Sequence, residues 1–319
     1  MSVSALGIVL FQCAASAQAP DYPNKPIRII THSPAGASPD VVARIWGERL
    51  SAALGQKIVV DNRPDGAGAI AMGAVAKAAP DGYTLGTMTF SHAVDPAIVA
   101  QLPYDTARDL APVRQTTQGS LMLAVNADSP HRSIAALVAS AKAQPAHLAY
   151  ASSGNAAPTH LFAEVFKART GTDIRHILYK GGVAATTALL GNQVEILSTS
   201  GAAVIAQIRA GKIRPLATGS PERMPALPDV PTLAEFGYTG FDVRDWQGLV
   251  VPAKTPKAII DRLSAEMTKA LEQPEVKDRF ATLGVETVGT SNPEAFGALI
   301  QAELTRWAKV VRDSGVRAD

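Results

Sequence analysis

A run of small and hydroxyl-bearing residues, 31–40, separates an apolar stretch from a helical pattern. Ser38 is a good N-cap, Pro39 suits the first helical position, and Asp40 falls in the first turn, where the helix dipole favours negative charge. Gly36 lets the backbone come close to a ligand. A strand that enters a helix through such a loop directs several unpaired N–H groups at one point, which suits a carboxylate. An ordinary strand-to-helix turn is the alternative interpretation.

The same arrangement recurs at residues 152–160, which follow a short strand pattern and precede a helical pattern that begins at Leu161. A third example follows, in which Gly181 and Gly182 form the turn. The first two loops predict two domains that each offer a helix N-terminus to one cleft. Neither of these loops contains Lys or Arg, so a bound anion must be held by N–H groups, hydroxyls and helix dipoles.

Polar residues also follow the strand expected at residues 83–88. In open α/β sheets, ligands bind at the carboxyl ends of the strands. The candidates for one rim of a binding site are therefore Ser33, Gly36, Thr89 and Ser91.

Strands and helices alternate along the chain at the spacing of βαβ units, which predicts an α/β fold of mostly parallel sheets flanked by helices. A chain of 319 residues is long enough for two domains. No low-complexity linker divides it, so ordered strands are expected to cross between the domains near residues 121–125 and 247–252. The expected domain I combines residues 20–122 and 250–319, and domain II comprises residues 123–249.

The composition argues against several classes of function. Hydrophobic residues make up 47% and charged residues 18% of the chain, as in a globular protein. The formal net charge of +2, without a Lys/Arg cluster, argues against nucleic acid as a partner. An aromatic share of 5% likewise leaves few rings that can stack on bases.

Residues 1–19 have the pattern of a secretory signal. They contain no charged residue, include an apolar run and end in Ala17-Gln18-Ala19, an A-x-A cleavage pattern. We therefore expect cleavage after Ala19 and a periplasmic mature chain. Cys13, the only cysteine, lies in this segment, and whether it carries a lipid stays open. Cleavage would leave the mature protein without a thiol nucleophile.

An enzyme is the main rival to a binding protein. Residues Gly66 to Ala71 fit G-x-G-x-x-A, a pattern of dinucleotide-binding loops, so an NAD(P)-dependent enzyme is the alternative function. However, the strand ends at Asp61, whereas the turn of a true fingerprint follows its strand directly. The sequence has no G-x-S-x-G, no H-E-x-x-H and no Cys/His cluster, so we expect no catalytic residues, no metal site and no cofactor. A structural or adhesion protein, the third class, would have no deep cleft.

Several short motifs are shared with one known family. They are Tyr22-Pro23-Asn24-Lys25-Pro26-Ile27-Arg28, Pro34-Ala35-Gly36, Asp61-Asn62-Arg63-Pro64, Pro80-Asp81-Gly82-Tyr83, Tyr179-Lys180-Gly181-Gly182, Leu227-Pro228-Asp229-Val230-Pro231-Thr232, and Trp307 with Val310-Val311. In their order and spacing, from Tyr22 to Asp319, the chain resembles the extracytoplasmic substrate-binding proteins of the tripartite tricarboxylate transporter family, also called Bug-type receptors.

The resemblance implies a two-domain, type II periplasmic-binding-protein fold whose interdomain cleft holds a small carboxylate. It implies hinge bending around this ligand and delivery to the membrane components of a tripartite tricarboxylate-type transporter. We expect a monomer.

The resemblance also implies ligand contacts. In the first loop they fall on Ser33, Ala35, Gly36 and Ala37. In the second domain they fall on Ser153, Gly154, Asn155, Thr159 and His160, with Gly182 and Ser200 nearby.

Two departures from the family pattern bear on the ligand. Ala37 stands where the family usually has a second Gly, so the backbone approach there is slightly hindered. The strand at residues 197–200 offers only hydroxyls where many members carry an Asp. This disfavours an ammonium-bearing ligand, because no anion remains at that place to pair with it.

Overall fold

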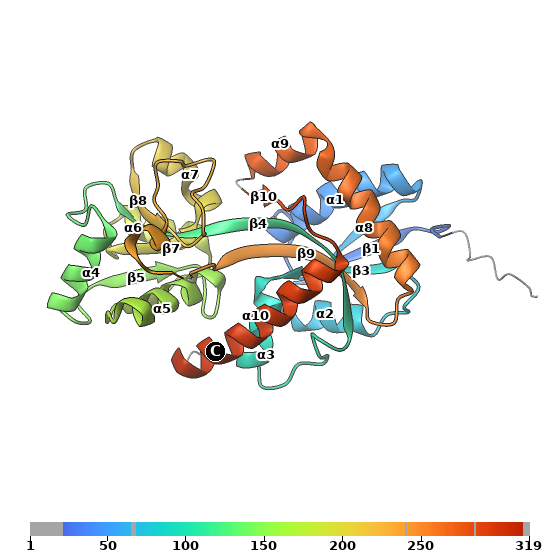
Figure 1. The fold of residues 1–319 in the computed structure, drawn as a ribbon, viewed down its shortest axis with the longest axis horizontal. Coiled ribbons are helices and arrows are strands. Elements are labelled where there is room, and N and C mark those ends of the chain that lie inside the picture. The colour runs from blue at the N-terminus through green and yellow to red at the C-terminus, as the bar shows by residue number, and fades with distance from the viewer. Residues whose placement is uncertain (1–21, 65–67, 240, 284, 315–319) are drawn as a thin grey trace, which may run out of the picture.

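The long strand β4 (Leu110–Asn126) joins two lobes, each built on its own sheet (Figure 1). Its first half pairs with strands of one lobe, and its second half, from Leu121 onward, pairs with strands of the other. The computed structural model describes residues 22–64, 68–239, 241–283 and 285–314.

Lobe I contains the parallel strands β1 (Ile27–Thr31), β2 (Ile58–Asn62) and β3 (Thr84–Thr89), in the order β2-β1-β3. Strand β9 (Arg244–Pro252) lies between β3 and β4 and runs antiparallel to both. The short strand β10 (Glu286–Thr287) also pairs with β4. The sheet is therefore mixed, because β9 runs against the strands of the βαβ units.

Lobe II repeats this plan at the other end of β4. Strand β5 (Ala149–Ser152) lies between the parallel strands β6 (Arg175–Leu178) and β7 (Ile196–Ser200). The second half of β4 runs antiparallel to β7 and to β8 (Ile213–Thr218).

Each parallel strand of the two lobes leads towards a helix. In lobe I the helices are α1 (Ser38–Leu54), α2 (Ala69–Ala76) and α3 (Phe90–Ile98). In lobe II they are α5 (Pro158–Thr170), α6 (Gly182–Leu190) and α7 (Gly201–Arg209), with α4 (Ile134–Ala143) before β5 and a 3-10 turn at Leu233–Phe236. Because the parallel strands of a lobe share one direction, these helices begin at the carboxyl edge of its sheet.

The C-terminal helices return to lobe I, as Figure 1 shows in orange and red. Helix α8 (Lys257–Glu272) packs against α1 and β4, and α9 (Pro274–Thr282) follows it. Helix α10 (Pro293–Ser314) packs against α3 and β4, and it also contacts α5 of lobe II. The tail thus covers both faces of the lobe I sheet and touches the neighbouring lobe.

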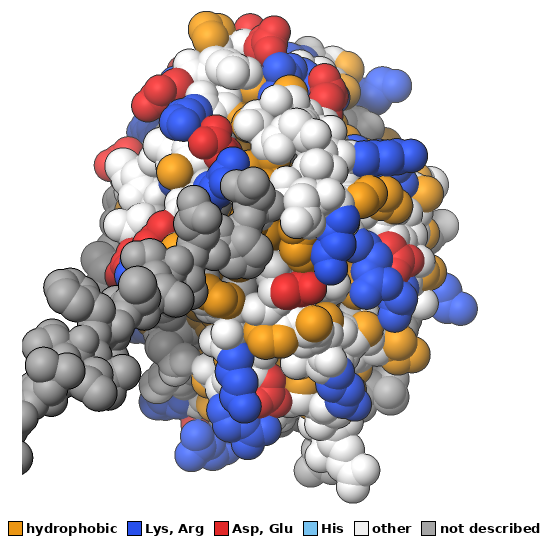
Figure 2. Space-filling view, turned by 90° about the vertical axis from the view of Figure 1, so that its right-hand side faces the viewer, with side chains coloured by type: hydrophobic (Ala, Val, Ile, Leu, Met, Phe, Trp, Pro, Cys, Tyr) orange, Lys and Arg blue, Asp and Glu red, His pale blue; other side chains and the backbone are white. Residues whose placement is uncertain are grey.

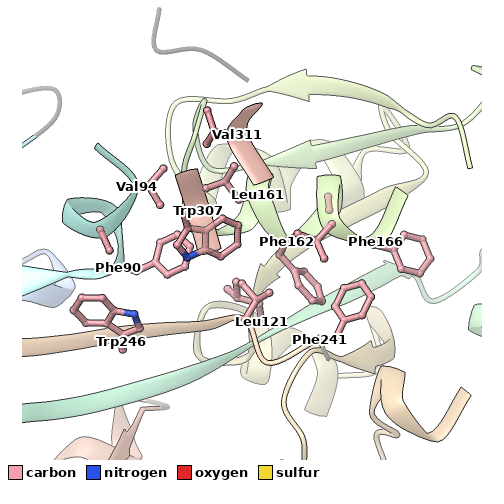
Figure 3. Close-up of a cluster of buried hydrophobic side chains, with 14 of the residues drawn as sticks. Phe90, Val94, Leu121, Leu161, Phe162, Phe166, Phe241, Trp246, Trp307 and Val311 are labelled. Atoms are coloured by element: carbon pink, nitrogen blue, oxygen red, sulfur yellow. The ribbon is translucent and has the colours of Figure 1, made fainter. Parts of the chain in front are cut away.

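One hydrophobic core spans both lobes on the side of α10. Trp307 of α10 meets Phe90 of α3 edge-to-face, with ring centroids 4.9 Å apart. Leu161 of α5 belongs to the same buried cluster, and Figure 3 shows it beside Trp307 and Val311. Burial of such large side chains is typically worth about 1.5–3 kcal/mol each, so this cluster holds the lobes together behind the β4 crossing.

The outer face of lobe I has the mixed character of a solvated surface. Figure 2 shows Lys and Arg interspersed with Asp and Glu, with hydrophobic side chains between them. Within the described residues, no helix is both long and apolar enough to cross a membrane.

The α/β architecture predicted from the sequence is confirmed, and one local detail is corrected. Ser38 is the first residue of α1 and not its N-cap; Ala37 occupies the cap position without a side-chain bond to the helix. The division into domains at residues 122/123 and 249/250 stays a prediction. The expected signal segment, 1–19, and Gly66 with Ala67 lie outside the described residues.

Candidate functional site

The first loop is held in place by a buried carboxylate. Gly36 has φ +85°, and its N–H donates a hydrogen bond of 2.8 Å to Asp40 Oδ2. The other oxygen of Asp40 accepts from Asn62 Nδ2 at 2.8 Å, and Arg44 also donates to this group. Burial opposes ionisation, yet the hydrogen bonds from Arg44, Gly36 and Asn62 hold the pKa of Asp40 below its ordinary value. The carboxylate fixes the loop from within.

The second loop has the same construction with a different side chain. Ala156 has φ +53°, and its N–H donates a hydrogen bond of 3.0 Å to His160 Nδ1. His160 is the third residue of α5, as Asp40 is the third residue of α1. In both loops an extended Ala precedes the helix: Ala37 at φ −74°, ψ 160° and Ala157 at φ −62°, ψ 157°.

This shared backbone plan leaves the same groups available in both loops. The left-handed residue of each loop donates its N–H to the side chain at the third helical position, and the N-cap N–H bonds back to Pro34 O or Gly154 O. The N–H groups of the first helical turn have no acceptor inside an α-helix. The first-turn N–H groups of α1 and α5 are therefore the donors that the helices leave without an acceptor, whereas the N–H of Gly36 is used within its own loop.

The register of β4 relates the carboxyl edges of the two lobes. At the carboxyl end of β3, Thr89 lies opposite Gln247, and Gln247 lies opposite Thr117 of β4. At the carboxyl end of β7, Ser200 lies opposite Leu121 of β4. The two carboxyl edges are therefore four residue steps apart along β4, a span of about 13 Å at 3.3 Å per residue. The strand ends that lead into the helices of the two lobes are thus a short distance apart along β4.

The predicted residues of lobe I are all near this edge, with different exposure. Ala35 and Gly36 are exposed and Ala37 is half-buried. Ser33 is buried, and its hydroxyl lies 3.1 Å from Thr31 Oγ1. Thr89 is also buried, and it forms a capping box with His92 at the start of α3, where Ser91 is half-buried. The hydroxyls of Ser33 and Thr89 therefore already have partners inside the protein.

In lobe II the predicted residues gather around the start of α5. Ser153 donates its N–H to Thr159 Oγ1 at 3.0 Å, and the two hydroxyl oxygens are 2.8 Å apart. Ser200 is the N-cap of α7, but its side chain makes no cap bond. The remaining predicted positions are half-buried: Gly154 and Asn155 in the loop, and Gly182 as the first residue of α6.

The ring of His160 faces the protein interior. Its side chain stacks on His176, with centroids 4.0 Å apart, and Tyr150 stacks on the same His176 at 4.8 Å while its centroid is 6.4 Å from that of His160. The hydroxyl of Tyr150 donates to Glu164 Oε1 at 2.6 Å, and His176 Nε2 lies 2.7 Å from Ser152 Oγ. A direct contact between His160 and a ligand stays a prediction, whereas its geometry gives it a role in positioning the loop.

The sequence interpretation missed three supporting residues. Asn62 joins Asp40 to Ser33 O, and its position at the carboxyl end of β2 was the available signal. Gln247 donates from Nε2 to Ser38 Oγ at 3.0 Å, a contact across the sheet that no local pattern reveals. His92 lies fully buried beneath the first loop, edge-to-face with His32, and burial with the adjacent His32 holds its pKa well below the ordinary value. In the described residues, no group of His, Cys, Asp or Glu is arranged to hold a metal ion.

Known proteins resemble this chain over nearly its whole length. A family model described as "Tripartite tricarboxylate transporter family receptor" matches residues 42–316. Protein BugT of Bordetella pertussis is 36% identical over 319 residues, which cover 99% of this chain and 98% of that protein. The structure of R. palustris Rpa4515 with adipate has 31% identity and a TM-score of 0.80, and covers 93% of this chain and 99% of its own. The structure of MatC from Rhodopseudomonas palustris with bound malate has 28% identity and a TM-score of 0.77, and the match covers 91% of this chain and 100% of that chain.

Proposed function

The chain belongs to the family of tripartite tricarboxylate transporter receptors, and from this premise we propose that it captures a small carboxylate between its two lobes in the periplasm. The family gives it a solute-binding role. Two similar structures hold adipate and malate, which are both small carboxylates. The similarity to the structure with adipate covers 93% of this chain and extends through both lobes, which supports a carboxylate site of the same fold here.

The observation that best supports this proposal is the matched pair of loops. Each loop places a left-handed residue and an extended Ala before a helix. In each loop the N–H of the left-handed residue donates a hydrogen bond to a side chain of that helix. One helix N-terminus typically stabilises an anion by 0.3–1 kcal/mol when exposed and by about 2 kcal/mol when partly buried. Two preorganised N-termini that both contact the ligand would add to this at little cost of reorganisation.

We propose that the protein binds its carboxylate ligand and does not convert it. The alternative, an NAD(P)-dependent enzyme that uses Gly66 to Ala71, has no support from the family or from the similar structures. Gly68 is the N-cap of α2, so a helix does begin near this pattern. The family's solute-binding role accounts for the chain without a dinucleotide.

We further propose that the receptor works as a monomer and passes its ligand to membrane components of a tripartite tricarboxylate-type transporter. Export with cleavage after Ala19 would deliver it to the periplasm, where this exchange takes place. The intact mass of protein recovered from the periplasm tests the cleavage, and a lipid-bearing product that retains Cys13 would contradict it.

A thermal-shift screen with small carboxylates and dinucleotides tests the function. A ligand at 100 times its Kd stabilises the folded protein by about 2.7 kcal/mol, which is readily detected as a rise in Tm. We expect stabilisation by a subset of the carboxylates. Stabilisation by NAD(P) alone would favour the enzyme, and the absence of any response would count against both.

Ligand binding should also bring the lobes together by rotation about the β4 crossing, because the two loops belong to different lobes. Small-angle scattering with and without a saturating carboxylate hit measures this change. Identical curves would contradict closure without contradicting binding.

A further inference from the structure

Asp245 lies on β9, midway between the carboxyl edges of the two lobes. It lies opposite Gly119 in the pairing of β9 with β4. Gly119 stands two residues from Thr117, which marks the carboxyl edge of lobe I, and two residues from Leu121, which marks that of lobe II. At 3.3 Å per residue, Asp245 is therefore about 7 Å along the strand from each edge.

The side chain of Asp245 points towards the face of the sheet on which α1 lies. Side chains alternate between the two faces of a strand, so Asp245 shares its face with Gln247. The amide of Gln247 reaches Ser38 at the start of α1. Farther along β9, Leu249 belongs with Trp46 of α1 to one core cluster, whereas Trp246 belongs to the cluster on the opposite face.

The surroundings of Asp245 leave its carboxylate without a counter-charge. Gly119, opposite Asp245, has no side chain. A Cβ built on Gly119 would lie 4.0 Å from Val285, so the neighbouring group at this position is apolar. The neighbouring Arg244 pairs with Asp242. Asp245 is half-buried, and within the described part of the chain no ion pair or hydrogen bond engages its side chain. Its partial removal from water raises its pKa to about 6.

An unpaired carboxylate beside an anion site constrains the ligand. It repels a second carboxylate placed against it, and it accepts a hydrogen bond from a hydroxyl or ammonium group. We propose that Asp245 is a specificity-determining residue of the interlobe site, which accepts a hydrogen bond from a donor group that the carboxylate ligand carries. This inference rests on the proposed function, and it assigns the ligand to the hydroxy or amino acids. It also supplies, on β9, the anion that is missing from residues 197–200.

Three matched series of acids test this assignment. They are propionate, lactate and alanine; succinate, malate and aspartate; and adipate, 2-hydroxyadipate and 2-aminoadipate. Within each series only one hydrogen is replaced, by a hydroxyl or by an ammonium group. Calorimetry with the full mature chain gives Kd for each acid, and comparison of the hydroxy and amino acids identifies which donor Asp245 accepts from. We expect the tightest ligand to carry a donor and to bind about tenfold or more tighter than its unsubstituted parent.

The variants Asp245→Asn and Asp242→Asn form a matched pair, because each removes one carboxylate from the same segment and Asp242 is paired with Arg244 at the surface. Asp245→Asn should reduce the preference for the donor-bearing acid about tenfold or more, whereas Asp242→Asn should leave it unchanged. Wild-type preference for the unsubstituted acids would overturn the inference and leave the proposed function standing. Equal effects of the two variants, or no binding in any series, would overturn it as well. The wild-type ranking decides the matter even if Asp245→Asn does not fold.

Discussion

Replacement of Gly36 by Val separates the role of the first loop in folding from its role in binding. Gly36 has φ +85°, a conformation that costs an L-residue about 1–2 kcal/mol and a β-branched residue more. A Cβ at this position would meet nothing within 4 Å, so the new side chain adds no clash in the free protein. We expect Gly36→Val to lower the free energy of unfolding by roughly 2 kcal/mol and to leave the protein folded.

The effect on binding should be much larger than the effect on stability. The branched side chain would project from the exposed loop beside the first-turn N–H groups of α1, where the carboxylate is proposed to lie. Calorimetry with a carboxylate hit from the thermal-shift screen should therefore detect no binding to Gly36→Val. Urea unfolding, followed by circular dichroism, measures the stability of the same preparation.

Gly55 supplies the matched control. It is the C-cap of α1, has φ +67°, and likewise leaves open space for a Cβ. Gly55→Val should cost about the same stability through the same backbone strain, and it should bind the ligand as the wild type does. If Gly36→Val binds as tightly as Gly55→Val, the first loop does not cradle the ligand.

The other predictions concern single hydrogen bonds and charges. Ser33→Ala and Thr159→Ala should each weaken binding less than about tenfold, since one hydrogen bond contributes about 0.5–1.5 kcal/mol and both hydroxyls already have protein partners; calorimetry tests this, and a complete loss would refute it. Asp40→Asn should destabilise the protein by about 1.5–3 kcal/mol at pH 7, because an amide cannot accept all the bonds that Arg44, Gly36 and Asn62 donate. Since the folded pKa of Asp40 is lowered, its stabilisation should disappear as the pH falls through that value, so equal urea midpoints for variant and wild type at pH 7 would refute this account. Asp245 changes stability in the opposite direction, because its folded pKa is raised to about 6. The free energy of unfolding falls as the pH rises from the ordinary pKa of an Asp to that value. Asp245→Asn should therefore raise the free energy of unfolding by up to about 3 kcal/mol at pH 7.5, but not at pH 4. A Tm at pH 7.5 that is no higher than that of the wild type would contradict this.

Local patterns predicted much of the fold, because small residues and turn signals mark each passage from strand to helix. The loop at residues 31–40 and the helix after it were recognised from Gly36, Pro39 and the apolar periodicity that follows. The cap was misassigned to Ser38, because a hydroxyl satisfies the N-cap preference, whereas the third-position Asp40 reaches back to Gly36 instead.

Long-range pairing explains what the sequence did not reveal. The first half of β4 contains Pro112, Arg114 and two threonines and lacks a simple alternation, so a strand that begins at Leu110 was not expected. Bulges in its pairing with β9, between Pro112 and Arg114 and between Gln115 and Thr117, account for the irregular pattern. The importance of Asp245 depends on its register opposite Gly119, which joins segments far apart in the chain.

A crystal structure of the protein with a carboxylate hit from the thermal-shift screen tests the central claim most directly. The account predicts that the carboxylate lies between the lobes, with its oxygens within about 3.2 Å of first-turn N–H groups of α1, α5 or both. A carboxylate bound outside this gap, such as in the groove between α5 and α10 lined by Lys167, Arg169 and Arg312, would contradict it.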